Sequence, residues 1–145
     1  MKTKAVKKGV VAIAFKAVRG SRKFLLLRRA LHWRGWEFPK GGREGREPYR
    51  QTVLRELGEE AGIPRWEVVS ITPTRLRLKF VAKSGRPRDL KAFLVEVRPS
   101  AAASLSRNPF REHSALRWVS AGRALRMLLW RDARKLFEEA LDEVR

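Results

Sequence analysis

One helix-forming stretch, residues 48–61, lies between two groups of strand-like segments, and this order restricts the possible folds more than any other feature of the sequence. Pro48 suits the first turn of a helix, and Gly62, with Pro64 beyond it, suits a helix end. The flanking segments are short and rich in β-branched and aromatic residues, which is typical of strands. A helix between groups of strands favours an α/β sandwich around a sheet over a helical bundle.

Hydrophobic periodicity and turn residues predict the remaining segments. We expect strands over residues 9–18, 23–29, 68–72, 74–81 and 90–97, with a short extended piece over 36–38. We expect loops over residues 41–45 and 98–114, and one helix or two in series over 121–144. No linker or repeat interrupts the 145 residues, so a single domain spanning 1–145 is predicted.

The composition excludes several kinds of site. The chain has no cysteine and only two histidines, His32 and His113, so thiolate or histidine metal cages are not expected and any metal should bind to oxygen. No apolar run is long enough for a membrane span or a secretory signal, which predicts a cytoplasmic protein without a membrane partner. The scarcity of Asn, Gln and Cys beside many charges is typical of thermophiles.

The charge is unevenly distributed along the chain. The net charge is +19, which favours a polyanionic partner. Residues 37–67 nevertheless hold seven acidic and six basic residues, a balance of −1, while the other residues carry +20. An acidic segment in a basic chain indicates a site where carboxylates hold cations and the surroundings hold an anion, although a solvated helix face would give the same count.

Three acidic residues share one side of the expected helix. At 100° per residue, with Glu56 at zero, Glu59 lies at about −60° and Glu60 at about +40°. The arc that the three carboxylates occupy borders the apolar side of the helix. Carboxylates placed this close together repel one another unless a cation lies among them. Oxygen ligands of this kind suit Mg²⁺ or Mn²⁺. The alternative is a surface helix whose acidic residues pair with Arg55 and other arginines.

The spacing around these acidic residues matches a known signature. Gly41, five residues, Glu47, seven residues and then Arg55-Glu56-Leu57-Gly58-Glu59-Glu60-Ala61-Gly62-Ile63 satisfy every position of G-x5-E-x7-R-E-U-x-E-E-x-G-U, where U is a bulky aliphatic residue. Residues 41–63 thus resemble the Nudix box of the Nudix hydrolases. The resemblance implies an α/β/α sandwich around a mixed sheet and a Mg²⁺- or Mn²⁺-dependent hydrolysis of a nucleoside diphosphate linked to another group.

The resemblance also implies roles for individual residues. Glu56, Glu59 and Glu60 match the catalytic metal ligands, and Arg55 matches the arginine that holds those carboxylates. Glu47 matches an acidic residue that supports or joins the metal site. The backbone carbonyl of Lys40 is expected to face a metal, and its ammonium group a phosphate.

The proton acceptor differs among members of this family, which use either a box glutamate or one from a later loop. Glu112 is the loop candidate, because Glu112-His113-x4-Trp118 resembles a stretch of dinucleoside polyphosphate hydrolases. We expect a catalytic or metal-binding role for Glu112 or, alternatively, a surface position. His113 is expected to be structural.

Substrate-binding candidates lie outside the box. Residues 36–41 resemble the corresponding stretch of asymmetric diadenosine tetraphosphate hydrolases and RNA 5′-pyrophosphohydrolases, and Phe80 lies where the former carry a base-stacking tyrosine. Arg75, Arg77 and Lys79 alternate with apolar residues and place three cations on one strand face, which points either to the substrate or to water.

These features predict a pyrophosphohydrolase that acts on a nucleoside polyphosphate, with diadenosine tetraphosphate as the best single substrate. The enzymatic alternatives are hydrolysis of RNA 5′ ends, nucleoside triphosphates or ADP-ribose. A basic RNA-binding protein that keeps the fold is the non-enzymatic alternative, and the intact set of carboxylates argues against it.

Overall fold

The computed structural model of the chain describes residues 4–30, 33–106 and 112–143. The strands are β1 Lys7–Val18, β2 Ser21–Arg29, β3 Gly35–Glu37, β4 Lys40–Gly42, β5 Val68–Val81, β6 Pro87–Val97 and β7 His113–Val119. The helices are α1 Tyr49–Ala61, α2 Ala121–Met127 and α3 Arg131–Glu143, with a 3₁₀ turn at Arg65–Glu67. None of the described helices is long and apolar enough to cross a membrane.

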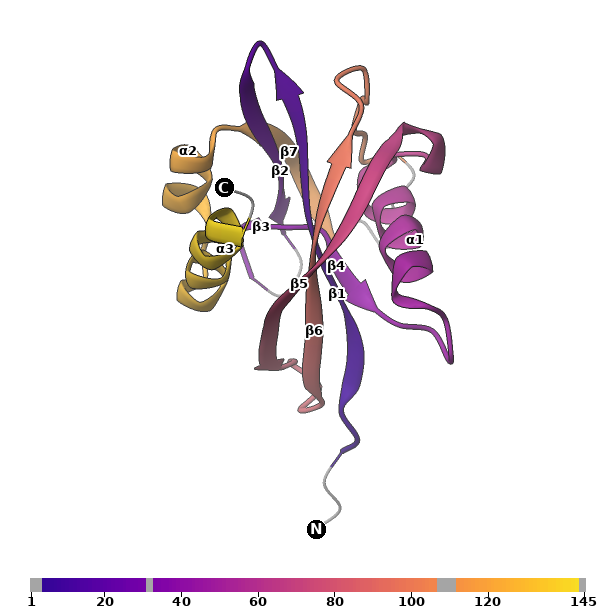
Figure 1. Cartoon of the computed structure of the whole chain (residues 1–145). Helices are drawn as coiled ribbons and strands as arrows, with labels where there is room; N and C mark the ends of the chain where they lie inside the picture. The colour runs from indigo at the N-terminus through magenta and orange to yellow at the C-terminus, as the bar shows by residue number, and fades with distance from the viewer. Residues whose placement is uncertain (1–3, 31–32, 107–111, 144–145) are drawn as a thin grey trace.

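The strands form one mixed sheet with the order β3-β2-β1-β6-β5, to which β4 adds beside β1 and β7 beside β2. β1 runs parallel to β6, whereas the other pairings are antiparallel. Helix α1 covers one face of the sheet, and α2 and α3 cover the other (Figure 1). The expectation of an α/β/α sandwich around a mixed sheet is therefore confirmed.

The side chains of β1 explain why both faces of the sheet are covered. Val10, Ala12 and Ala14 pack in the cluster that includes Val53, Leu57 and Ala61 of α1. Val11 and Ile13 point to the other face and pack with Leu136 and Phe137 of α3. A strand that is apolar on both sides must be buried on both sides, because successive side chains alternate between the faces.

Helix α1 ends where its sequence predicts. Pro48 occupies the N-cap position, and Gly62 ends the helix in the left-handed region at φ 64°. The Gly62 N–H donates to the Gly58 carbonyl, and the Ile63 N–H donates to the Leu57 carbonyl. Glycine adopts this backbone conformation without the strain that a Cβ atom would cause.

Three expectations for individual segments are corrected by the structure. Residues 41–45 are not entirely loop, because β4 extends through Gly42. The segments 68–72 and 74–81 form one strand, β5, whose pairing register shifts between Pro73 and Arg77. The sequence did not predict strand β7, which begins at His113, inside the loop expected over 98–114. Residues 107–111 of that loop lie outside the described residues.

Candidate active site

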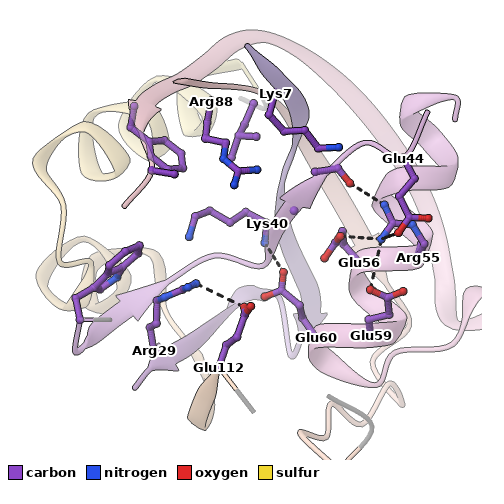
Figure 2. Close-up of a pocket in the computed structure, with 16 residues that line it drawn as sticks. Lys7, Arg29, Lys40, Glu44, Arg55, Glu56, Glu59, Glu60, Arg88 and Glu112 are labelled. Carbon is purple, nitrogen blue, oxygen red and sulfur yellow. Dashed lines mark hydrogen bonds and ion pairs between the residues drawn. The ribbon is translucent and has the colours of Figure 1, made fainter. Parts of the chain in front are cut away.

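The site forms where the free edge of β4 faces α1. Glu56 and Glu60 are buried between the strand and the helix, and Glu59 is more exposed, with a side chain 42% accessible. Figure 2 shows the three carboxylates on one wall of a pocket, with Lys7, Arg29, Lys40 and Arg88 across from them. The helical spacing thus brings the three predicted carboxylates together.

Gly41 allows the strand to approach the helix closely. A Cβ atom at this position would lie 2.0–2.3 Å from the three carboxyl atoms of Glu56. Only glycine leaves room for that carboxylate, so the first glycine of the signature is required by contact with Glu56 and not by its own backbone angles.

The backbone of Lys40 faces the same carboxylates. On either side of Lys40, backbone hydrogen bonds join this segment to β1. The Ala12 N–H donates to the Pro39 carbonyl and the Arg43 N–H donates to the Lys8 carbonyl, each at 2.8 Å. In an antiparallel ladder the hydrogen-bonded residues alternate, so both polar backbone groups of Lys40 turn away from β1. The Lys40 N–H accordingly donates to Glu60 Oε1 at 3.2 Å, and the Lys40 carbonyl lies on that same edge.

Arg55 binds the acidic residues that surround it. Its Nε and Nη2 donate to the two carboxylate oxygens of Glu47 at 3.0 and 2.9 Å, and its Nη1 donates to Glu56 Oε1 at 2.9 Å and to Glu59 Oε2 at 3.4 Å. Nη2 also donates to the Gly42 carbonyl at 2.7 Å. The hydrogen bonds to Glu47, opposed by burial, raise the pKa of the Arg55 guanidinium. Arg55 thus joins α1 to β4 and orients two of the three carboxylates.

Glu47 lies behind Arg55 and does not line the pocket itself. Hydrogen bonds from Arg55, opposed by burial and assisted by Thr52, lower the pKa of Glu47 to about 2. Its carboxylate is therefore charged at neutral pH and is occupied by the guanidinium. This position supports the carboxylate cluster through Arg55.

The buried carboxylates are suited to a divalent cation. Burial raises the pKa of Glu56, and this effect outweighs the hydrogen bonds with Glu60 and Arg55, which lower that pKa. Burial and the negative charge of Glu56 raise the pKa of Glu60 well above its usual value. Two carboxylates that resist ionisation beside each other, next to an outward-facing carbonyl, form an oxygen donor set of the kind that hard cations bind. A bound divalent cation would compensate their charge.

Glu37 anchors the basic wall of the pocket. Its buried carboxylate accepts a 2.8 Å hydrogen bond from Lys40 Nζ and lies 3.6 Å from Arg29 Nη1. Burial opposes its ionisation, but the hydrogen bond from His113 and the charges of Lys40 and Arg29 outweigh burial and lower the pKa of Glu37 to about 2. The sequence predicts no role for Glu37, Arg29 or Arg88, because nothing in their local pattern separates them from ordinary strand residues.

Glu112 lies at the pocket, where Figure 2 shows it beside Arg29. Glu112 Oε2 lies 3.6 Å from Arg29 Nη1. The next residue, His113, has a fully buried side chain, and its Nε2 lies 3.2 Å from Glu37 Oε2.

Aromatic side chains extend the pocket away from the carboxylates. Phe80 and Trp33 line both the polar pocket and a neighbouring apolar one, which Trp130 and Leu78 also line. The two tryptophan rings meet edge to face, with their centroids 5.9 Å apart. Phe80 also packs against the buried core.

Arg75, Arg77 and Lys79 are not brought to the polar pocket. The three residues are exposed on β5, on the opposite face from Phe80, because side chains alternate along a strand. Arg77 Nη1 instead donates to Asp89 Oδ1 on β6, at 3.3 Å.

The comparisons with known proteins agree with this geometry. The family model of the NUDIX domain matches residues 7–140, so the chain belongs to the NUDIX domain family. It is a Nudix hydrolase, an enzyme that acts on phosphoric anhydride bonds.

Among curated relatives, the asymmetrical bis(5′-nucleosyl)-tetraphosphatase of Sus scrofa is 34% identical over 118 residues, covering 81% of this chain and 77% of the relative. An RNA pyrophosphohydrolase of Nitratiruptor sp. is 36% identical over 76 residues, 48% of this chain and 49% of the relative. The solved binary complex of a C. elegans Ap4A hydrolase superposes with a TM-score of 0.79 at 23% identity, covering 95% of this chain and 97% of that one, which shows the shared fold.

Proposed function

We propose that this enzyme hydrolyses a dinucleoside polyphosphate, with diadenosine tetraphosphate as the best single substrate, in a reaction that depends on Mg²⁺. The observation that carries the proposal is the pocket of about 380 Å³, in which carboxylates face cations and aromatic rings lie at one end. Such a pocket matches a ligand with a phosphate chain, bound metal and a base. The Sus scrofa tetraphosphatase, similar over 81% of this chain, supports the same substrate class.

Glu56, Glu59, Glu60 and the carbonyl of Lys40 are the groups that would hold Mg²⁺, or Mn²⁺ in its place. Bound Mg²⁺ neutralises phosphate charge and lowers the pKa of a coordinated water. Arg55 keeps Glu56 and Glu59 in position, and Glu47 keeps Arg55 in position. These contacts make the donor set rigid before substrate binds, which is how a protein lowers the reorganisation cost of catalysis.

Glu112 is the proposed proton acceptor for the attacking water. It lies at the same pocket as the box carboxylates, and Arg29 restrains it through a contact of 3.6 Å. Lys40, Arg29 and Arg88 would bind phosphate oxygens from the opposite wall. Their positive charges would offset the negative charge that the substrate brings beside Glu37 and the box carboxylates.

The apolar pocket beside the phosphate site is the proposed base site. Phe80 borders both pockets, and Trp33 and Trp130 complete an aromatic surface around the apolar one. Stacking of a base on an aromatic ring contributes ~1–3 kcal/mol in single-strand binding proteins. Phe80→Ala should therefore raise KM for diadenosine tetraphosphate by roughly 5- to 150-fold and affect inorganic polyphosphate, which has no base, much less.

The experiment compares the purified protein and Phe80→Ala in Mg²⁺ on diadenosine tetraphosphate, a 5′-triphosphorylated RNA, ATP, ADP-ribose and inorganic polyphosphate. Trp66→Ala serves as the matched control, because Trp66 is 71% exposed and does not line either pocket. If Phe80→Ala loses activity equally on substrates with and without a base, the aromatic ring serves only the core. If RNA is hydrolysed with a higher kcat/KM than the dinucleotide, the substrate assignment is wrong.

RNA 5′-pyrophosphohydrolysis is the second candidate. The RNA pyrophosphohydrolase of Nitratiruptor sp. supports it over about half of each chain. Arg75, Arg77 and Lys79 are exposed beyond the pocket, where the phosphates of a longer nucleic acid would meet them. Substitution of all three by Gln should lower kcat/KM for the RNA while leaving that for diadenosine tetraphosphate unchanged, if RNA is the substrate.

A further inference from the structure

The face of the sheet opposite the active site carries a cluster of cations below α1. Strand β6 directs Arg88 and Leu90 into the polar pocket, so Asp89 and Lys91 lie on the other face, because side chains alternate along a strand. Helix α1 covers the upper part of that face, and the joined ends of β5 and β6 extend below it in Figure 1. We define the basic sheet face as the cations of this lower part, Lys8, Arg43, Arg77, Lys79 and Lys91.

Two rows of side chains cross the basic sheet face. In the first row, Lys79 of β5, Asp89 of β6 and Lys8 of β1 are register partners. In the second row, Arg77 lies directly opposite Lys91. Neighbouring strands are ~4.8 Å apart, and residues two positions apart along a strand are separated by ~6.6 Å. The two rows therefore place four cations within an area of roughly 10 by 7 Å.

An aromatic ring lies beside these rows. Tyr49, the first residue of α1, is half-buried, and the Lys91 ammonium lies 5.7 Å from the centre of its ring. The Arg43 guanidinium lies 5.1 Å from the same centre. Arg43 donates to the backbone carbonyl of Glu47, whose carboxylate is held by Arg55. The positive surface thus continues from the strands to the start of the helix.

The charges of the basic sheet face are poorly balanced. Asp89 Oδ1 lies 3.3 Å from Arg77 Nη1, and its Oδ2 lies 3.8 Å from Lys8 Nζ. In the part of the chain that the structure describes, Lys79 and Lys91 form no ion pair with a carboxylate. Like charges directly opposite each other on neighbouring strands destabilise a sheet. Five cations around one carboxylate are therefore unfavourable until an anion binds among them.

We propose that the basic sheet face binds a single-stranded nucleic acid through its phosphate backbone, independently of the active site. Rows of cations beside an aromatic ring are the features with which proteins hold single strands without reading their sequence. A single strand offers phosphates to the two rows and a base to Tyr49, whereas inorganic polyphosphate or an anionic lipid surface offers charge alone. The proposal goes beyond the proposed function, because the bound strand needs no 5′-phosphate and does not enter the pocket.

The test uses the full-length protein and a fluorescent single-stranded RNA of about 12 nucleotides, a length within the range of known binding sites. The RNA has a 5′-hydroxyl end and the buffer contains EDTA, so neither a phosphoric anhydride nor a metal engages the active site. Fluorescence anisotropy measures the affinity at several salt concentrations. Because each neutralised phosphate of a single strand contributes about −0.7 to the slope of log affinity against log salt, four to five contacts predict a slope of about −3.

The triple variant Arg77→Gln/Lys79→Gln/Lys91→Gln removes three cations of the basic sheet face. Its slope should be less steep by about 2, and its affinity at low salt should fall roughly 10- to 100-fold. Circular dichroism melts verify that the variant folds. If it does not fold, Lys8→Gln/Lys79→Gln takes its place, because both side chains are exposed, and the slope should then change by about 1.4.

A second triple variant is the matched control for net charge. Arg19→Gln/Arg22→Gln/Lys23→Gln removes the same three charges at the turn between β1 and β2, at the other end of β1 from Lys8. Its affinity for the RNA should stay within about threefold of the wild-type value, because the charges that it removes do not contact the strand.

Tyr49→Leu tests the choice of a nucleic acid over other polyanions. The substitution keeps an apolar side chain next to Phe93 but removes the ring. RNA affinity should fall roughly fivefold or more, while the affinity for inorganic polyphosphate should not change.

Several results would overturn the proposal. One is a wild-type protein that does not bind the RNA at low salt, and another is an equal loss of affinity in the two triple variants, which would assign binding to the net charge. Tighter binding of polyphosphate, or of vesicles of phosphatidylserine and phosphatidylcholine, with the same sensitivity to the first triple variant would assign the face to that partner. Failure of the proposed function is seen separately, as a wild-type protein that does not hydrolyse any substrate of the panel in Mg²⁺.

Discussion

Replacement of Gly41 by alanine tests the idea that the approach of β4 to α1 sets the position of the catalytic carboxylates. The new Cβ would lie 2.0 Å from Glu56 Cδ, and ordinary contact begins at 3.4 Å, so the carboxyl group must shift by about 1.4 Å. The atoms that must shift belong to the end of a flexible side chain, and Gly41 is not at a positive φ. The fold should therefore tolerate the change while the metal site does not.

The size of the effect follows from that displacement. A misplacement of ~1 Å at a reacting centre costs roughly 100-fold in rate, and metal ligands tolerate only ~0.2 Å. We expect kcat/KM of Gly41→Ala to fall by ~100-fold or more, with Mg²⁺ affinity reduced and the melting temperature little changed. Initial rates across a Mg²⁺ titration, together with circular dichroism melts, measure these quantities.

Gly58→Ala is the matched control, because it also adds one methyl group inside the signature. Its Cβ would meet only the Ile63 carbonyl oxygen, at 3.9 Å, and Gly58 lies within α1. Alanine there should raise stability by ~0.5–1 kcal/mol and leave kcat unchanged. If Gly41→Ala stays within about threefold of wild type in kcat/KM, the close approach does not position Glu56 and the reasoning is refuted.

Three further predictions concern charge. Glu60→Gln should abolish turnover. In EDTA at pH 7 it should nevertheless raise Tm, because the raised pKa of Glu60 means that its ionised form destabilises the folded protein. The rise should be ~2–4 °C for each kcal/mol of repulsion relieved. The difference in Tm should vanish near pH 4, below both the folded and unfolded pKa, where the wild-type carboxyl is already protonated; a constant difference would contradict this. Mg²⁺ binding should weaken as pH falls, because protons held by Glu56 and Glu60 compete with the metal, and calorimetry in two buffers should detect proton release. If the net charge of +19 attracts the substrate, kcat/KM should fall steeply from low to physiological ionic strength while kcat stays flat; a flat kcat/KM would assign the charge to solubility.

The parts of the molecule that depend on local sequence were predictable. Helix α1 could be bounded from Pro48 and Gly62, and its three carboxylates could be placed on one side from their spacing alone. Gly41 was assigned from the signature, but its contact with Glu56 is a property of the packed structure.

Long-range contacts were not predictable from the same information. Glu37 and His113 are separated by 76 residues, and nothing in either segment indicates that β3 and β7 flank β2 and bring the two side chains together. Strand β7 was missed because its residues do not alternate cleanly between polar and apolar. The direction of Arg75, Arg77 and Lys79 depends on which face of β5 meets the helices, which periodicity leaves open.

The free edge of β5 has a consequence for the behaviour of the protein at high concentration. Among the described strands β5 pairs only with β6, so one side of this 14-residue strand has no strand partner there, although the Arg75 N–H donates to Glu143 Oε1 at 3.5 Å. A long exposed edge of this kind can pair with a second copy and begin aggregation. Arg75, Arg77 and Lys79 would bring like charges together along any such pairing, and Pro73 lacks the N–H that a continuous ladder needs. These residues would therefore oppose pairing of this edge with a second copy, whether or not they ever contact a substrate.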